Sequence, residues 1–189
     1  MLNSVNSSIA DETKTATWAL DPAHSRVQFS AKHMIISTVK GNFNSYGVNV
    51  HTEGDNFETA DIEVIIDTSS IDTGAPDRDN HLRSDDFFNA EKYPQMKFKS
   101  TKLEKLDDES YKLYGDLTIR DITKPIELEV EYGGTVIDPW GNTRVGFSVN
   151  GSLDRFEYGL KWNALIETGG AVVGKTIKLS ADIELIKQK

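Results

Sequence analysis

Two short segments of the chain bring together side chains that could do chemistry. The first is Asp21-Pro22-Ala23-His24-Ser25, which supplies a carboxylate, an imidazole and a hydroxyl group. A serine nucleophile needs a histidine base that a carboxylate orients, so these are the residue types of a catalytic triad. Neighbouring residues of a strand point to opposite faces, however, so His24 and Ser25 diverge if both lie in a strand. We therefore expect Asp21 and Ser25 to bond backbone groups in a turn that precedes the strand.

The second segment runs from Asp77 to Phe88 and reads DRDNHLRSDDFF. Pro76 suits the first turn of a helix, and Asp77 and Asp79 suit the positive end of the helix dipole. This pattern predicts a short helix from about Pro76 to about Phe88.

The side chains of this predicted helix have two interpretations. Arg78 and Arg83 could bind a phosphate or carboxylate head group, with His81 adding a hydrogen bond and Phe87 and Phe88 packing near an apolar chain. Alternatively, the arginines pair with the local aspartates and the two phenylalanines close one end of the fold. We favour the closing role for the phenylalanines and leave both interpretations open for the arginines.

Other reactive chemistry has little support in the sequence. The chain has no cysteine, which excludes disulfides, thiolate metal ligands and cysteine nucleophiles. The four histidines, His24, His33, His51 and His81, are scattered without the spacing of a metal site. We therefore expect no metal and no cofactor.

The rest of the chain has the period-2 alternation of β-strands. Weaker patterns predict further strands through Met96 and Phe98, from Phe43 to Val50, and from Phe156 to Trp162. The apolar phase changes between Phe43 and Tyr46 and again between Leu153 and Phe156, which suggests bulges or bends. The clear inward positions are Val27, Phe29 and Ala31; Ala60, Ile62, Val64 and Ile66; Leu113, Gly115, Leu117 and Ile119; Ile126, Leu128, Val130 and Tyr132; Val145, Phe147, Val149, Gly151 and Leu153; and Ile177, Leu179, Ala181, Ile183 and Leu185.

These strands predict an all-β fold with one short helical segment. Alternation alone is compatible with a sandwich or a barrel, but several runs exceed the usual strand length of roughly 5 to 6 residues. Long, curved strands favour a closed antiparallel barrel of eight strands. Small residues at inward positions (Ala31, Ala60, Gly115, Gly151 and Ala181) could leave its interior hollow; alternatively, they face bulky aromatic side chains or mark bends.

Charge and chain length limit the function further. The 189 residues fit one domain, for which we predict residues 18–189, preceded by a flexible polar segment at residues 1–17. The formal net charge of −9 argues against nucleic acid as a partner. Residues 1–17 lack the pattern of a secretory signal, so we expect a cytoplasmic protein from the sequence as given, or a periplasmic one if a signal has been removed.

The chain resembles the YceI-like family. The resemblance runs from Trp18 to about Ile186 and rests on LDPAHSRVQFSAKHM, KGNF, SSIDTGAPDRDNHLRSDDFFNAEKYPQMKF, YGDLTIRDITKPIEL and SLDRFEYG, in this order. It implies a lipocalin-like barrel whose apolar tunnel holds a long isoprenoid or acyl chain, and a binding protein rather than an enzyme. The expected ligand is a polyisoprenoid, an isoprenoid quinone or a fatty-acid derivative.

Together, the strand phase and the resemblance predict the ligand-binding residues. We expect the predicted helix near one mouth of the tunnel, transient contact with a membrane, and a homodimer if a partner covers an apolar mouth. Two other functions are weighed: a hydrolase or isomerase acting on a lipid through His24, His33 or His81 with a nearby aspartate, and a filled, stress-related barrel that acts through its acidic surface. The predicted ligand-binding residues are Val27, Phe29, Ala31, His33, Ile62, Val64, Arg78, His81, Phe98, Leu117 and Phe147.

Overall fold

The structure, a computed structural model, describes residues 14–164 and 172–189. Within these ranges the chain forms an 11-stranded sheet, one α-helix and two short 3-10 helices, labelled η. The strands are β1 (Thr15–Leu20), β2 (Arg26–His33), β3 (Ser37–Phe43), β4 (Tyr46–Glu53), β5 (Asn56–Asp67), β6 (Ile71–Asp72), β7 (Gln95–Lys105), β8 (Ser110–Ile119), β9 (Ile122–Ile137), β10 (Thr143–Asp154) and β11 (Val173–Lys187). The helices are η1 (Thr68–Ser70), α1 (Pro76–Arg83) and η2 (Arg155–Tyr158).

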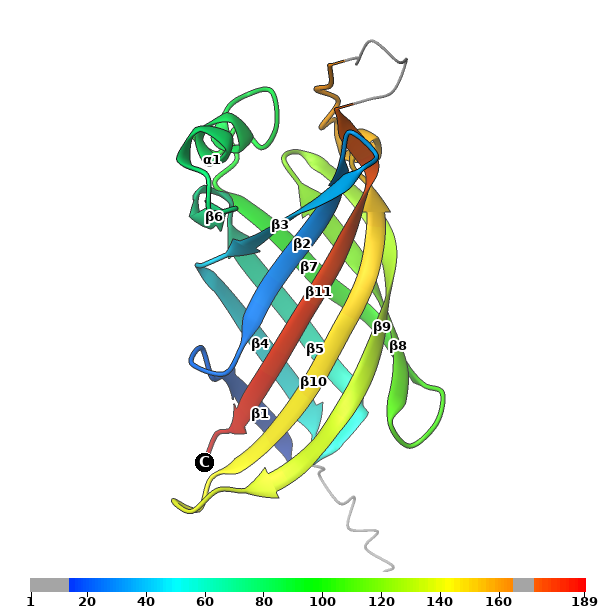
Figure 1. Cartoon of the computed structure of the whole chain (residues 1–189). Coiled ribbons are helices and arrows are strands. Elements are labelled where there is room, and N and C mark those ends of the chain that lie inside the picture. The colour runs from blue at the N-terminus through cyan, green and yellow to red at the C-terminus, as the bar shows by residue number, and fades with distance from the viewer. Residues whose placement is uncertain (1–13, 165–171) are drawn as a thin grey trace, which may run out of the picture.

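Eight of the described strands close into an antiparallel barrel. They follow the order β1-β4-β5-β7-β8-β9-β10-β11, and the pairing of β1 with β11 completes the ring. Figure 1 shows the long, tilted strands around the barrel axis. The predicted all-β, eight-stranded antiparallel barrel is therefore confirmed. In the described part of the chain, no helix is long and apolar enough to cross a membrane.

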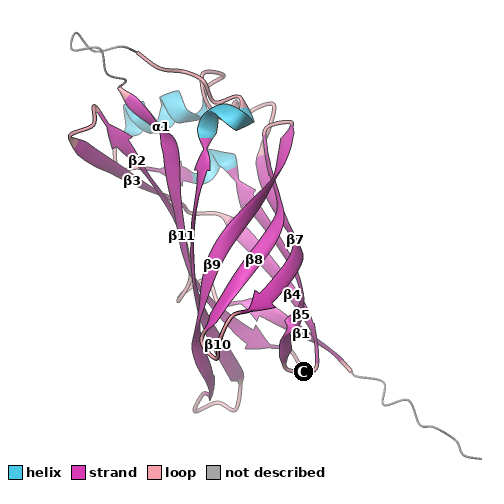
Figure 2. Ribbon diagram, turned by 90° about the vertical axis from the view of Figure 1, so that its right-hand side faces the viewer, coloured by secondary structure: helices cyan, strands magenta, loops and turns pink. Residues whose placement is uncertain are grey.

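Three further strands extend the barrel wall at one end. Strand β11 pairs with β1 through Leu185 to Lys187, whereas its earlier residues, from Val173 to Asp182, pair with β2. Strands β3 and β6 continue the sheet from β2. These strands lie toward the end that carries α1 (Figures 1 and 2), which we call the helix end. The opposite end, where β1 and the β9–β10 hairpin lie, is the far end.

The single strand predicted from Phe43 to Val50 is two strands that do not pair with each other. Strand β3 ends at Phe43, and β4 begins at Tyr46 in a different part of the barrel. The turn between them is held by Asn44, whose N–H donates to the carbonyl of Ser70, and by the carbonyl of Ser45, which accepts from the N–H of Asp67. The change of apolar phase marks a corner of the chain here, and not a bulge.

The strand predicted from Phe156 to Trp162 is also wrong, because this segment begins with η2. The Asp154 carboxylate accepts the backbone N–H of Phe156 at 3.0 Å and caps the first turn. Gly159 ends the turn in the left-handed conformation, with a φ of 76°. Local capping thus outweighs the apolar alternation that suggested a strand.

Helix α1 begins at Pro76 as predicted but ends at Arg83, before the predicted end at Phe88. Ser84 is extended, and its hydroxyl donates to the carbonyl of His81 at 2.7 Å, which caps the helix early. At the N-terminus, β1 begins at Thr15, ahead of the predicted domain start at Trp18, because it pairs with β4 and buries Ala16. Residues 1–13 of the predicted flexible segment lie outside the described residues.

Candidate ligand-binding cavity

The barrel encloses an apolar cavity of about 580 Å³. This volume falls within the roughly 300 to 1,000 Å³ of typical ligand pockets. The cavity is lined by the inward positions of nearly every barrel strand, as the period-2 pattern predicted. All eleven residues predicted to bind the ligand line this cavity: Val27, Phe29, Ala31, His33, Ile62, Val64, Arg78, His81, Phe98, Leu117 and Phe147. Their contact with a ligand stays a prediction.

The small inward residues do not all contribute to the hollow. Ala31 and Ala181 line the cavity. A Cβ atom at Gly115 would overlap the ring of Phe98, and one at Gly151 would overlap the side chain of Leu128. The space beside each glycine is therefore occupied by a large neighbouring side chain. Among these small residues, it is the alanines Ala31 and Ala181 that border the hollow interior.

Aromatic side chains close the barrel at its far end. The centroids of the Trp18 and Phe57 rings lie 4.9 Å apart, and those of Phe57 and Phe147 lie 5.1 Å apart. Trp18 is only 1% exposed, and its indole N–H donates to the Thr52 hydroxyl at 2.9 Å. Phe57 lies outside the alternation that predicted Ala60 and Ile62, because the register of β5 shifts opposite His51 and Glu53. Sequence periodicity therefore could not identify it as a cavity residue.

Most of the polar lining lies at the helix end. Lys32 and His33 come from the end of β2, and Asp77, Arg78 and His81 come from α1. The remaining lining is almost entirely apolar. An amphiphile in this cavity would have its chain in the barrel and its polar group beside these residues.

The two arginines of α1 differ in their surroundings. Arg78 lines the cavity, and its Nε and Nη2 groups donate to the hydroxyl and carbonyl of Thr73 at 2.7 and 2.9 Å. Arg83 donates to the carbonyls of Ser69 and Ile71, each at 2.7 Å, and so ties α1 to η1 and β6. Within the described residues neither arginine pairs with a carboxylate, so the predicted pairing with local aspartates is not what holds them. Arg78 is the arginine that faces the candidate site.

His81 sits between polar and aromatic partners at the helix end. Its Nε2 lies 2.8 Å from a carboxylate oxygen of Asp86. Its ring makes edge contacts with the rings of Trp162 and Phe87, with centroids 4.7 and 5.1 Å apart. These contacts fix the imidazole at the cavity wall. Phe87 and its neighbour Phe88 also line the cavity, in keeping with the closing role that the sequence favoured for them.

Arg155, at the start of η2, is a buried cation at the same cavity. It is 2% exposed, and its guanidinium donates to the carbonyls of Leu160, Trp162, Val173 and Gly174. Burial lowers the pKa of this guanidinium. Two of these carbonyls precede residues 165–171 and two follow them, so Arg155 holds the two parts of the backbone together at this end of the barrel.

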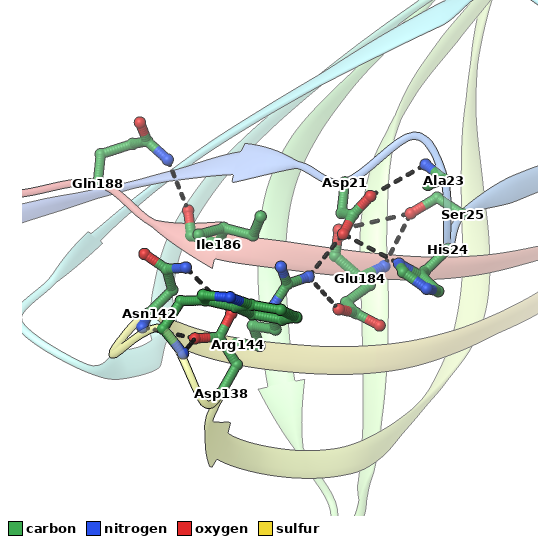
Figure 3. Close-up of polar contacts among 11 residues, drawn as sticks. Asp21, Ala23, His24, Ser25, Asp138, Asn142, Arg144, Glu184, Ile186 and Gln188 are labelled. Carbon is green, nitrogen blue, oxygen red and sulfur yellow. Dashed lines mark hydrogen bonds and ion pairs between the residues drawn. The ribbon is translucent and has the colours of Figure 1, made fainter.

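The segment from Asp21 to Ser25 forms an ion-pair cluster outside the cavity (Figure 3). Arg144 donates to Asp21 at 2.5 Å, to Asp138 at 2.7 Å and to Glu184 at 2.6 Å. Figure 3 shows Arg144 between these three carboxylates. Hydrogen bonds, first from His24 and then from Arg144, lower the pKa of Asp21 to about 2.

This cluster does not have the arrangement of a catalytic triad. His24 bonds Asp21 at 3.0 Å, but the Ser25 hydroxyl accepts the backbone N–H of Glu184 at 2.9 Å. Asp21 also accepts the N–H of Ala23, so the predicted backbone bonding of Asp21 and Ser25 is found. Side-chain atoms of Asp21, His24 and Glu184 come within 4.8 Å of one another, but Arg144 already donates to both carboxylates.

A closed β-barrel around an apolar cavity, with polar groups at one end, defines a barrel of the kind that encloses apolar small molecules. The chain belongs to the YceI-like family, because the profile of the YceI-like domain matches residues 18–185. The match covers the barrel from β1 to β11.

Individual relatives agree with this assignment. A UPF0312 protein of Staphylococcus aureus strain USA300 is 38% identical over 168 residues, which are 88% of this chain and 95% of that protein. The solved YceI protein of Campylobacter jejuni is 36% identical, with a TM-score of 0.73 over 84% of this chain and 90% of that one. A polyisoprenoid binding domain from Saccharophagus degradans shares the fold, with a TM-score of 0.66, 15% identity, and coverage of 90% of this chain and 98% of that domain.

Proposed function

We propose that the protein binds a long-chain apolar amphiphile in the barrel and stores or carries it, without catalysing its conversion. The observation that carries this proposal is the apolar cavity of about 580 Å³, with its polar lining gathered at the helix end. The fold shared with a polyisoprenoid binding domain supports the same class of ligand. Candidate ligands are a polyisoprenoid, an isoprenoid quinone and a fatty-acid derivative.

The physical basis is the transfer of the chain out of water. Each methylene that enters an apolar cavity contributes about 0.8 kcal/mol. A dozen such groups would give useful affinity after the cost of ordering the ligand. Arg78, His81 and His33 would then supply donors to the polar group, and these few contacts would set specificity.

The two other functions weighed differ in how they stand against the geometry. The cavity argues against a barrel filled by its own side chains. For the enzymatic alternative, His24 lies in the ion-pair cluster away from the cavity lining. His33 and His81 do line the cavity, and His81 contacts Asp86 at 2.8 Å, so acid–base chemistry there stays a prediction. The absence of turnover, the compartment and the predicted homodimer stay predictions.

Native mass spectrometry of the purified protein, followed by solvent extraction and lipid identification, tests the proposal. We expect one apolar molecule per chain. In the Ala181→Trp variant the new ring occupies the cavity, so the lipid should be lost. Thr176→Trp places the same ring at an exposed position of the same strand and should leave the lipid in place. A wild-type protein that stays lipid-free after incubation with geranylgeraniol, menaquinone and palmitic acid would contradict the proposal.

A further inference from the structure

The β2–β3 hairpin ends in an exposed apolar turn at the helix end of the barrel. His33 pairs with Ser37, so the turn consists of Met34, Ile35 and Ile36, which we call the apical tip. Ile35 is 72% exposed and Ile36 is 87% exposed. Such adjacent, largely exposed isoleucines are unfavourable in water unless something covers them.

The backbone of the apical tip also has a conformation that isoleucine rarely adopts. Met34 and Ile35 have positive φ angles of 49° and 70°. Hairpin turns of this kind normally take glycine or asparagine, and a β-branched residue is an outlier there. The turn is nonetheless anchored, because the N–H of Met34 donates to the carbonyl of Val172 at 2.9 Å. Here the chain keeps isoleucine where a polar residue would be easier to accommodate.

The apical tip is continuous with the polar end of the cavity. Lys32 and His33, the two residues before the tip, line the cavity together with Arg78 and His81 of α1. Figures 1 and 2 show the β2–β3 hairpin at the same end of the barrel as α1. Anything that covers the tip therefore lies beside the polar end of the cavity.

The charge of the hairpin also differs from that of the whole protein. The chain has 30 acidic residues and a net charge of −9, yet residues 26–43 contain no aspartate or glutamate. They carry Arg26, Lys32 and Lys40, all exposed, in addition to His33. At physiological ionic strength charges are screened beyond roughly 8 Å, so a surface in contact with the tip senses the adjacent Lys32 more than the acidic residues of the far end.

We propose that the apical tip inserts into the surface of an anionic lipid bilayer and holds the helix end of the barrel against it. Exposed isoleucines close to a lysine, here Lys32, are a combination that enters the interface of an anionic membrane. A bilayer also needs no complementary shape, which suits a turn of three residues. This inference rests on the proposed function, since the docked cavity would exchange its amphiphile with the membrane.

Vesicle flotation tests the docking separately from ligand binding. The probe is vesicles of phosphatidylcholine and phosphatidylglycerol, compared with vesicles of phosphatidylcholine alone. We expect the wild-type chain to float with the anionic vesicles and to be released by high salt. Ile35→Asn with Ile36→Ser should weaken binding by about tenfold or more, because the apolar insertion is lost. Asparagine tolerates a positive φ, so this variant should fold.

A matched control comes from the far end of the barrel. Ile137 and Trp140, on the β9–β10 hairpin, are 75% and 79% exposed. The Ile137→Ser, Trp140→Ser variant removes as much exposed apolar surface and should float like the wild type. Docking at the apical tip is overturned if the control variant loses flotation, or if the apical variant floats normally. It is also overturned if the wild type does not float but forms a dimer that the apical variant lacks.

A loading assay separates failure of this inference from failure of the proposed function. Geranylgeraniol is offered either from ethanol or from the anionic vesicles, and uptake is measured by mass spectrometry. The Ile35→Asn, Ile36→Ser variant should take up geranylgeraniol at the wild-type rate from ethanol and more slowly than the wild type from vesicles. Equal rates from vesicles for both chains would reject the docking alone, whereas no uptake from either source by the wild type would reject the proposed function.

Discussion

The buried guanidinium of Arg155 links several carbonyl groups at the helix end. It donates hydrogen bonds to carbonyls that precede and follow residues 165–171, and it has no carboxylate partner among the described residues. Arg155→Met keeps much of the apolar volume but removes the guanidinium donor from the carbonyls of Leu160, Trp162 and Gly174, whereas the Val173 carbonyl keeps the donor of Asn163 at 2.9 Å. Because buried unsatisfied groups cost about 1–3 kcal/mol each at most sites, we expect a loss of at least about 3 kcal/mol in the free energy of unfolding.

Urea denaturation measures this loss. Arg26→Met, at an exposed position of β2, is the control and should change the free energy of unfolding by less than about 0.5 kcal/mol. Similar losses in the two variants would show that the carbonyl contacts of Arg155 do not stabilise the fold.

The Arg144 cluster makes a prediction about pH. Asp21 has a pKa of about 2 in the folded protein and an ordinary value of 3.8. Since the folded value is the lower one, the stabilisation is complete above about pH 4 and is lost as the pH falls through about 2. Asp21→Asn should therefore be less stable at pH 7 and should lose less further stability between pH 4 and pH 2 than the wild type.

Thermal unfolding at several pH values tests this prediction. Asp116→Asn, at an exposed position of β8, serves as the control. It should follow the wild-type profile between pH 4 and pH 2. An Asp21→Asn profile parallel to that of the wild type would contradict the role given to the cluster.

At the level of elements, the packing of β7 against β8 limits the size of inward residues. A Cβ at Gly115 would overlap the Phe98 ring and lie 2.6 Å from the carbonyl oxygen of Lys99. Gly115→Ala should destabilise the barrel by about 1–3 kcal/mol and push Phe98 into the cavity, which would reduce ligand binding. Gly47→Ala in β4 meets nothing within 4 Å, so it should be neutral or stabilising by about 0.5–1 kcal/mol. Urea denaturation gives the free energy of unfolding of both variants, and mass spectrometry gives their lipid content. Equal stability of the two variants would contradict the packing argument.

Element types and their boundaries were predictable to different degrees. The alternation from Ile177 to Leu185 and from Leu113 to Ile119 identified strands and their inward faces, because one face of each strand meets an apolar interior. The segment from Phe156 to Trp162 has similar alternation, but the cap at Asp154 makes η2 there. Competition between a side-chain cap and strand pairing depends on neighbours that alternation does not report.

For the whole molecule, the cavity implies that stability depends on its content. A ligand that binds only the folded barrel stabilises it by about 2.7 kcal/mol at a hundred times its dissociation constant. We expect delipidated wild-type protein to have a lower Tm, which added ligand restores. Ala181→Trp, with its cavity occupied, should show no such shift in differential scanning fluorimetry. If the Tm of the wild type changes neither on delipidation nor on addition of ligand, the ligand-filled barrel is contradicted.

By itself, the sequence determined the all-β class, the inward face of most strands and the absence of disulfides, because these follow from local periodicity and composition. Through strand phase and family motifs, it also led to eleven of the residues that line the cavity. Only the tertiary structure decided that β11 pairs with both β1 and β2, that Arg155 bonds carbonyls distant in the chain, and that Arg144 joins Asp21 to Glu184. These features arise from contacts between residues far apart in the chain, whose partners are set by closure of the barrel and leave no periodic pattern in the sequence.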